Sequence, residues 1–203
     1  MQIIYQKVIR KLANYIFYLF NSGSIYQFTA RPKWQIKKIT ESKSDLYICH
    51  QETGLLLGVE LLKMGYKVAI DFEDWYSEDY LNKFRPVNLL KNAEAFVLKN
   101  TEYVSCPSES MATAINNAYG IKKYIHVIYN SFPSINTYQK QVERIPNSMV
   151  WFSQTIGPNR GIEFLLKALK LIKVPLQIHF IGKCSKYYKS HIVEELHLSL
   201  IHI

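Results

Sequence analysis

Residues 45–71 read DLYICHQETGLLLGVELLKMGYKVAID, and this stretch indicates the fold class. Its two ends, residues 46–49 and 67–71, are short apolar runs of the length of buried strands. Residues 53–64 between them carry leucine and valine at helical spacing, and Gly65 marks a turn before the second strand. A strand, a helix and a second strand in this order are typical of a parallel sheet.

The same alternation extends to both sides of this unit. Further helices are expected at residues 3–20, 32–40, 87–100 and 108–119, and further strands at residues 24–29, 103–106 and 125–129. Ser108 is placed to cap its helix and Gly120 to end it. The sequence therefore predicts an α/β fold whose parallel sheet is covered on both faces.

A polar segment interrupts the alternation and predicts a domain boundary. We expect residues 1–130 to form the first domain and residues 131–147, which contain Pro133 and Pro146, to be a linker. Residues 148–203 then begin a second domain, with an expected strand at 149–153, a helix at 162–173 and a strand at 176–181. Because one such unit cannot bury both faces of its sheet, we expect this domain to be incomplete.

Composition excludes several classes of protein. With 48% apolar residues in 203, the chain is not disordered, and it has no uncharged apolar run long enough for a transmembrane helix. Three cysteines without a CxxC pair exclude a disulfide framework and a cysteine-based zinc site. The N-terminus lacks the cleavage site of a signal peptide, and these features together predict the cytoplasm.

Positive charge is concentrated near the N-terminus. Of a net charge of +9, residues 1–43 supply +7, from eight basic residues against Glu41 alone. Such a patch attracts a nucleotide, an anionic lipid or a nucleic acid, or it is only a solvated face. We do not expect nucleic acid as a partner, because no recognition module accompanies the patch.

The first helix, residues 3–20, has two interpretations. Its apolar stripe has the ordinary spacing of a core-facing helix and favours packing on the sheet; it consists of Ile4, Val8, Leu12, Ile16 and Leu19. Alternatively, the mixture of lysine, arginine and aromatic residues on this helix suits an anionic membrane surface.

Residues 149–163, MVWFSQTIGPNRGIE, carry a candidate anion site. A strand leads through a Gly-Pro loop to Arg160 and Gly161, where the next helix starts. Helix starts offer unpaired N–H groups, and an arginine can grip phosphate oxygens with two hydrogen bonds. These residues suit a diphosphate, although a surface arginine beside a turn glycine would look the same.

Three acidic residues, Asp71, Glu73 and Asp74, stand at the carboxyl end of the strand at 67–71. Ligands of parallel sheets bind outside the carboxyl ends of the strands, where carboxylates can orient sugar hydroxyls or act as a base. Glu73 and Asp74 are therefore candidate catalytic residues, and His50, which ends the preceding strand, opens onto the same edge. The acids could equally cap the following helix, and a single histidine is more often structural.

Five ordered segments carry a family resemblance: DLYICHQE (45–52), KVAIDFEDWY (67–76), EYVSCPSESMA (102–112), HVIYNSFP (126–133) and MVWFSQTIGPNRGIEFLLKAL (149–169). Together they resemble the family-4 glycosyltransferases over about residues 45–183. The resemblance implies the GT-B fold, in which two Rossmann-like domains face a cleft that holds a nucleotide sugar. This chain would then hold one Rossmann-like domain, without its first strand, and the start of the second.

The resemblance also implies roles for individual residues. Arg160, with Gly161, matches the basic residue that binds the donor diphosphate in that family, and His50 matches a histidine at the end of its strand. Two further matches line the hinge or cleft. Ser108 and Glu109 resemble the family's Ser-Glu pair, and Asn130 resembles its asparagine before the hinge.

The chain also departs from the family. Residues 71–76 resemble its D-x-H-E-x-F segment, but Glu73 stands in the place of the histidine and Asp74 in the place of the glutamate. The family's Gly-rich loop and the later acidic pair that holds the donor's ribose and sugar have no counterpart here. We therefore expect a fragment truncated at both ends and inactive alone.

The function implied by the resemblance is glycosyl transfer from a nucleoside diphosphate sugar to a saccharide or lipid-linked acceptor hydroxyl. It would proceed with retention of configuration, without a cofactor or metal, in polysaccharide biosynthesis in the cytoplasm or at the inner membrane face. Two alternatives stay open. One is a non-catalytic membrane-surface or interaction module derived from such an enzyme, and the other is a sugar-nucleotide epimerase of the same fold.

Overall fold

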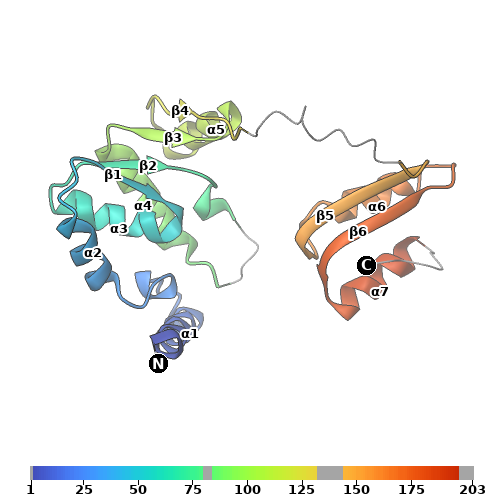
Figure 1. The fold of residues 1–203 in the computed structure, drawn as a ribbon, viewed down its shortest axis with the longest axis horizontal. Coiled ribbons are helices and arrows are strands. Elements are labelled where there is room, and N and C mark those ends of the chain that lie inside the picture. Colours follow the sequence, from blue (N-terminus) through green and yellow to red (C-terminus); the bar gives the residue numbers. More distant parts are fainter. Residues whose placement is uncertain (1, 80–83, 132–143, 197–203) are drawn as a thin grey trace. The chain divides into compact units, whose positions relative to one another are not determined.

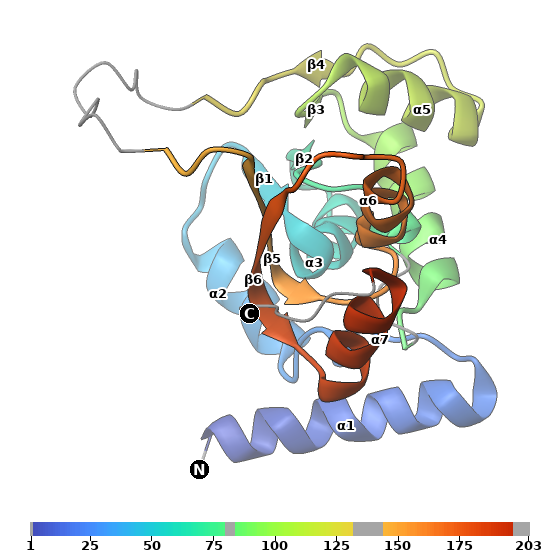
Figure 2. The ribbon, with the colours of Figure 1, turned by 90° about the vertical axis from the view of Figure 1, so that its right-hand side faces the viewer.

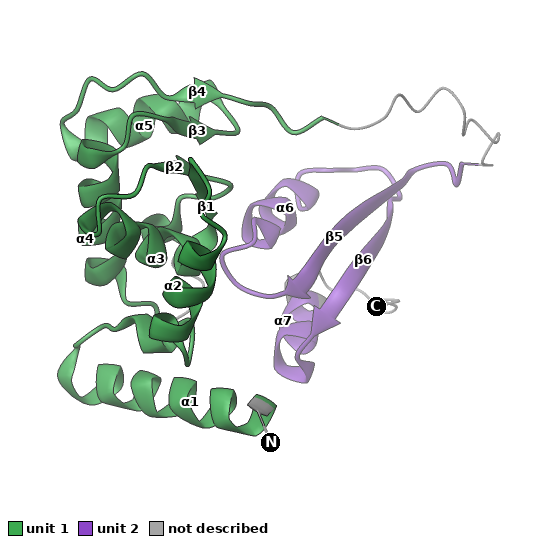
Figure 3. Ribbon diagram, turned by 60° about the vertical axis from the view of Figure 1, so that its left-hand side comes forward, with its two compact units in different colours: residues 1–132 green, residues 133–203 purple. Residues whose placement is uncertain are grey.

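The computed structural model describes residues 2–79, 84–131 and 144–196, and the chain divides into two compact units (Figure 1, Figure 3). Unit 1 comprises residues 1–132, and unit 2 comprises residues 133–203. Most of the predicted linker falls in residues 132–143, outside the described residues.

Unit 1 is built on a four-stranded parallel sheet. Its strands lie in chain order: β1 (Tyr47–His50), β2 (Val68–Asp71), β3 (Val104–Cys106) and β4 (His126–Val127). The crossover helices are α3 (Gln51–Lys63), α4 (Val87–Asn100) and α5 (Glu109–Tyr119), with the 3₁₀ turn η2 (Tyr76–Glu78) between β2 and α4. Before the sheet come α1 (Gln2–Phe20), η1 (Ile25–Gln27) and α2 (Pro32–Glu41). The sequence predicted this α/β architecture, apart from the differences described below.

One face of the sheet carries the core of unit 1. Alternate strand residues point to this face and pack in one cluster with buried residues of the crossover helices; the strand members are Tyr47, Cys49, Val68, Ile70, Val104 and Cys106. On the other face, Ile48 and His50 of β1 are exposed. The expected cover on both faces is therefore wrong for β1 in the described part of unit 1. This open face contains the candidate site.

Helix α3 lies very close to the sheet because of its glycines. A Cβ on Gly58 would come within 3.2 Å of the Cys49 sulfur and within 3.4 Å of side-chain atoms of Val68 and Ile70. A Cβ on Gly54 would meet Cys49 backbone atoms at 3.4 to 3.6 Å, an ordinary contact distance. Gly58 is therefore the position at which a side chain would push α3 away from β1 and β2.

Two elements predicted from the sequence differ in the structure, one in each unit. The expected strand at residues 24–29 is instead the turn η1, because the buried Gln27 side chain accepts the Ser24 backbone N–H and reaches across to α1. The expected helix at 162–173 ends at Leu169, where the backbone N–H groups of Leu171 and Ile172 turn to the carbonyls of Ala168 and Leu169, three residues back. By contrast, Ser108 caps α5 and Gly120 ends it in the left-handed region, as predicted.

Helix α1 has the predicted apolar stripe, but the stripe does not pack on the sheet. Its residues are 42 to 68% exposed: Ile4, Val8, Leu12, Ile16 and Leu19. The opposite side of α1 faces the rest of unit 1, where Arg10 and Asn14 form hydrogen bonds with Gln27 of η1. Among the described residues, no helix is both long and apolar enough to cross a membrane.

Unit 2 contains one small parallel sheet and two helices. Strand β5 (Ser148–Ile156) pairs with β6 (Gln177–Cys184), and α6 (Ile162–Leu169) and α7 (Lys186–Leu196) complete the unit. Its core consists of Ile156, Ile162, Leu166, Phe180, Tyr188 and Ile192. On the other face, Val150, Phe152 and Ile181 are more than half exposed. The described residues of unit 2 therefore bury only one face of its sheet.

Replacing Gly58 should destabilise unit 1. We expect Gly58→Val to lower the free energy of unfolding by about 1–3 kcal/mol, because the new side chain overpacks the contact between α3 and the sheet. The matched control is Gly54→Ala in the same helix, which should be neutral or stabilising by up to about 1 kcal/mol. Urea denaturation followed by circular dichroism measures both, and equal losses would disprove the close approach at Gly58.

Candidate functional site at the carboxyl edge of the sheet

A row of polar residues crosses the sheet of unit 1. In the parallel register, His50 of β1 lies opposite Asp71 of β2, Asp71 lies opposite Ser105 of β3, and Ser105 lies opposite His126 of β4. Register partners in a parallel sheet point to the same face. Four strands that are separated in sequence therefore place polar side chains side by side on the open face.

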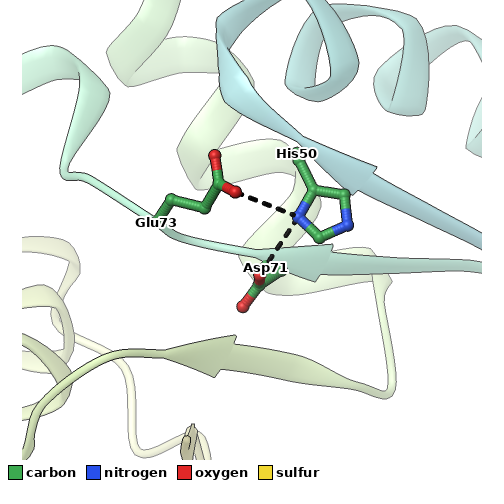
Figure 4. A group of neighbouring side chains, drawn as sticks. All are labelled: His50, Asp71 and Glu73. Carbon is green, nitrogen blue, oxygen red and sulfur yellow. Dashed lines mark ion pairs between the residues drawn. The ribbon is translucent and has the colours of Figure 1, made fainter. Parts of the chain in front are cut away.

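Three of these side chains, His50, Asp71 and Ser105, contact one another in a row, and Glu73 lies beside His50; Figure 4 shows His50, Asp71 and Glu73. His50 Nδ1 lies 3.0 Å from Asp71 Oδ2 and 3.9 Å from Glu73 Oε1. The Ser105 hydroxyl donates to Asp71 Oδ1 at 2.6 Å. Because one oxygen of Asp71 contacts His50 and the other accepts the Ser105 hydroxyl, the carboxylate is held in one orientation and in turn orients the imidazole of His50.

The row opens into a hollow of about 450 Å³. Its polar lining includes His50, Asp71, Glu73, Ser105 and Asn130, and its apolar lining includes Ile48, Phe72, Tyr103 and Ile128. The structure thus brings three sequence-predicted residues, His50, Glu73 and Asn130, to one cavity. The sequence groups Asp71 with Glu73 and Asp74 as acids that can orient hydroxyls or act as a base, whereas it gives no role to Ser105. The position of Ser105 in a strand that neighbours β2 was the signal that could have found it.

Tyr76 links the ends of β1 and β2 next to the site. Its hydroxyl accepts the Gln51 backbone N–H at 2.8 Å and donates to the Asp71 carbonyl at 3.2 Å. Burial raises the pKa of Tyr76 from its ordinary value of 10.0 to about 12, both well above physiological pH, and the protonated hydroxyl makes this donation. These two bonds hold Gln51, which follows His50, at a fixed distance from Asp71, which lies two residues before Glu73.

Glu94 of α4 anchors the segment that follows Glu73. This fully buried carboxylate accepts the Ser77 backbone N–H at 2.9 Å, the Ser77 hydroxyl at 2.7 Å, Trp75 Nε1–H at 3.2 Å and the Tyr119 hydroxyl. Burial, and then the bond to Glu94, raise the pKa of Tyr119. Sequence reasoning missed Glu94. Its place among the apolar residues on the inner face of α4 was the available signal.

Three predicted residues lie outside the hollow. Asp74 is exposed and is not part of the lining. The Ser108 hydroxyl accepts the Met111 backbone N–H at 3.2 Å, as a helix cap does, and Glu109 is exposed in the first turn of α5. Their predicted roles remain predictions.

Arg160 and Gly161 lie in unit 2, at the start of α6. Arg160 is exposed, and Gly161 precedes the helix with a φ of 80°. In the same loop, the Glu163 carboxylate accepts the Asn159 backbone N–H and the Tyr188 hydroxyl, each at 3.1 Å. Hydrogen bonds from its own backbone N–H and from Asn159 lower the pKa of Glu163. Since Glu163 already uses these N–H groups, anion binding here would depend mainly on Arg160.

The hollow also offers ligand atoms for a cation. One ligand atom each from His50, Asp71 and Glu73 lies within 4.8 Å of the others. An imidazole nitrogen and two carboxylates are a suitable donor set for a divalent metal. The same atoms, however, already fit a direct ion pair between His50 and Asp71, which needs no metal.

Comparison with known proteins tests the fold. No protein-family description and no curated protein matches the chain. Among solved structures, the chain is similar to a mutant of S. aureus TarM, solved in complex with fondaparinux, α-GlcNAc-glycerol and UDP. The TM-score is 0.51 at 14% sequence identity, over 82% of this chain and 35% of TarM. The fold is glycosyltransferase-like.

This likeness confirms the expected α/β fold with Rossmann-like parallel sheets of the GT-B type. At 14% identity it shows the fold alone, without a specific family or the stereochemical course of a reaction. The chain spans 35% of the length of TarM, so any activity of a whole protein is a matter for proposal.

Removal of the Glu94 carboxylate should loosen the segment beside the site. We expect Glu94→Ala to lower the free energy of unfolding by about 3 kcal/mol, because the buried Ser77 and the half-buried Trp75 and Tyr119 lose their common acceptor. Glu102→Ala, at an exposed position, should change it by less than about 0.5 kcal/mol. Urea denaturation compares the two variants. Indistinguishable midpoints would show that Glu94 does not anchor this segment.

Proposed function

We propose that this chain is part of a glycosyltransferase. The reaction would move a glycosyl group from a nucleoside diphosphate sugar to an acceptor hydroxyl, with retention of configuration, in polysaccharide biosynthesis in the cytoplasm. The acceptor would be a saccharide or a lipid-linked saccharide. The observation that carries the proposal is the His50–Asp71–Ser105 row, which opens into a hollow at the carboxyl edge of a glycosyltransferase-like sheet.

The chemistry of the hollow suits an acceptor sugar better than a phosphate. The carboxylates of Asp71 and Glu73 accept hydrogen bonds from hydroxyl groups, and they repel anions. Tyr103 and Tyr129 add aromatic rings to the lining, against which the apolar face of a sugar ring can pack. We therefore assign unit 1 to the acceptor.

His50 is the residue best placed to act on the acceptor hydroxyl. When its Nδ1–H donates to Asp71, the lone pair remains on Nε2, which can accept the proton that the hydroxyl loses. Asp71 then stabilises the imidazolium, and Ser105 holds Asp71 in place. Glu73 adds a second carboxylate near the imidazole and can orient a neighbouring hydroxyl.

We assign binding of the donor diphosphate to Arg160. Departure of the diphosphate builds negative charge, which a guanidinium stabilises with two parallel hydrogen bonds. TarM, a structural neighbour, was solved with UDP, and UDP is therefore the first nucleotide to test. In this assignment the diphosphate needs no metal ion.

Binding of UDP to the 203-residue chain tests the donor assignment. We expect Arg160→Ala to weaken binding about ten-fold or more, through loss of the two-point contact with phosphate. Lys173→Ala removes an exposed cation from the same unit and should leave the affinity unchanged. Isothermal titration calorimetry gives both values. Equal effects of the two substitutions would refute a specific role for Arg160.

Turnover tests the acceptor assignment. Because the chain spans 35% of TarM, the assay uses the polypeptide from the complete reading frame that contains these residues. We expect His50→Ala and Glu73→Gln to reduce kcat about 100-fold or more. Asp74→Asn is the matched control, one residue further along and outside the hollow, and should leave kcat unchanged. Release of UDP from UDP sugars measures the rate.

Three controls separate the competing interpretations. A large loss in Asp74→Asn with none in Glu73→Gln would reverse the assignment of the two acids. Inactivation by EDTA would contradict the metal-free proposal, and His50, Asp71 and Glu73 would then be the first residues to test as ligands of the cation. NMR of the product gives its anomeric configuration. Release of an epimerised sugar without any acceptor would identify an epimerase instead.

A further inference from the structure

Helix α1 exposes an unusually large apolar surface. Ten aliphatic and aromatic side chains on this one helix are 42 to 72% exposed: Ile3, Ile4, Tyr5, Val8, Leu12, Tyr15, Ile16, Tyr18, Leu19 and Phe20. Of its described side chains only Ala13 is buried. So many apolar side chains exposed to water on one helix usually mark an interaction site.

Polar contacts hold α1 so that this surface faces outward. The buried Gln27 of η1 accepts at its carbonyl from Arg10 Nε at 3.1 Å, and its side-chain amide donates to Asn14 Oδ1 at 3.0 Å and to the Phe84 carbonyl at 3.1 Å. Leu12, two positions from both Arg10 and Asn14, lies about 200° around the helix axis from each. Figure 1 and Figure 2 show α1 at one end of unit 1, beside η1 and away from the sheet.

Positive charge accompanies the apolar surface. Lys7 and Lys11, one turn apart, flank the apolar stripe, and both side chains are exposed. Helix α1 contains no acidic residue, and the first 43 residues carry a net charge of +7. Arg31 lies over the ring of Tyr5, 5.3 Å from its centroid, which adds a further cation at this end of the helix.

We propose that α1 docks unit 1 onto an anionic lipid surface and lies in the plane of the membrane interface. A helix with a lysine-flanked apolar stripe and several tyrosines suits this position. A second copy of the chain is the poorer occupant, because two α1 helices packed face to face would bring the lysines of one against those of the other. The inference rests on unit 1 alone and is independent of sugar transfer.

Vesicle co-sedimentation tests the docking surface. We expect the chain to bind vesicles of phosphatidylcholine with phosphatidylglycerol, and to bind phosphatidylcholine alone much more weakly. Lys7→Gln with Lys11→Gln should weaken binding about 30-fold, because each lysine near an anionic surface contributes about a five-fold factor. Val8→Ser with Leu12→Ser removes exposed apolar groups and should also release the protein, with an unchanged circular dichroism spectrum.

The matched control is Lys186→Gln with Lys189→Gln, which removes the same charge from exposed positions in unit 2. This pair should keep the wild-type affinity. Equal weakening by the two lysine pairs would show a non-specific charge effect and overturn the proposal. So would absence of binding to anionic vesicles, or a dimer in solution that Val8→Ser with Leu12→Ser converts to a monomer.

Discussion

The parallel register of β1, β2 and β3 is the constraint on which the candidate site depends. It brings His50, Asp71 and Ser105 opposite one another, although 21 and 34 positions of sequence separate neighbours in the row. A shift of one residue in any strand would turn its polar side chain to the core face. The register is in turn held by the core, where Cys49, Ile70 and Val104 pack against the helices.

Two hydrogen-bonding centres stiffen the loops around this register. Tyr76 joins the end of β1 to the end of β2, and Glu94 gathers donors from Trp75, Ser77 and Tyr119. A buried carboxylate is costly unless donors surround it. Glu94 meets that condition, so the segment after Glu73 has a preferred position. A site that must orient an acceptor hydroxyl requires such a rigid frame.

Acidic and basic side chains gather in different regions of the chain, and the charge of each region suits the partner proposed for it. Carboxylates line the hollow at the carboxyl edge of the sheet and suit the hydroxyl groups of an acceptor. Positive charge collects at α1, where lipid phosphates would bind, and the single cation Arg160 precedes α6, where the diphosphate of the nucleotide would bind. If the acceptor is linked to a lipid, docking through α1 would keep unit 1 at the surface where that acceptor lies.

The sequence by itself determined the α/β class, most strands and helices, the Ser108 cap and the closeness of α3 to the sheet, because these follow from local periodicity and from glycine or serine at helix ends. It also pointed to His50, Glu73 and Asn130 as residues that follow strands.

Only the tertiary structure decided what depends on contacts between distant segments. Asp71 and Ser105 join the site through strand register, and Glu94 becomes an anchor only when η2 and α5 pack around it. The orientation of α1 also depends on contacts with a distant segment. Its apolar stripe has the spacing of a core helix, but hydrogen bonds to Gln27 hold the opposite side of the helix against η1. Periodicity shows which residues share a face, whereas the packing partner decides which face is buried.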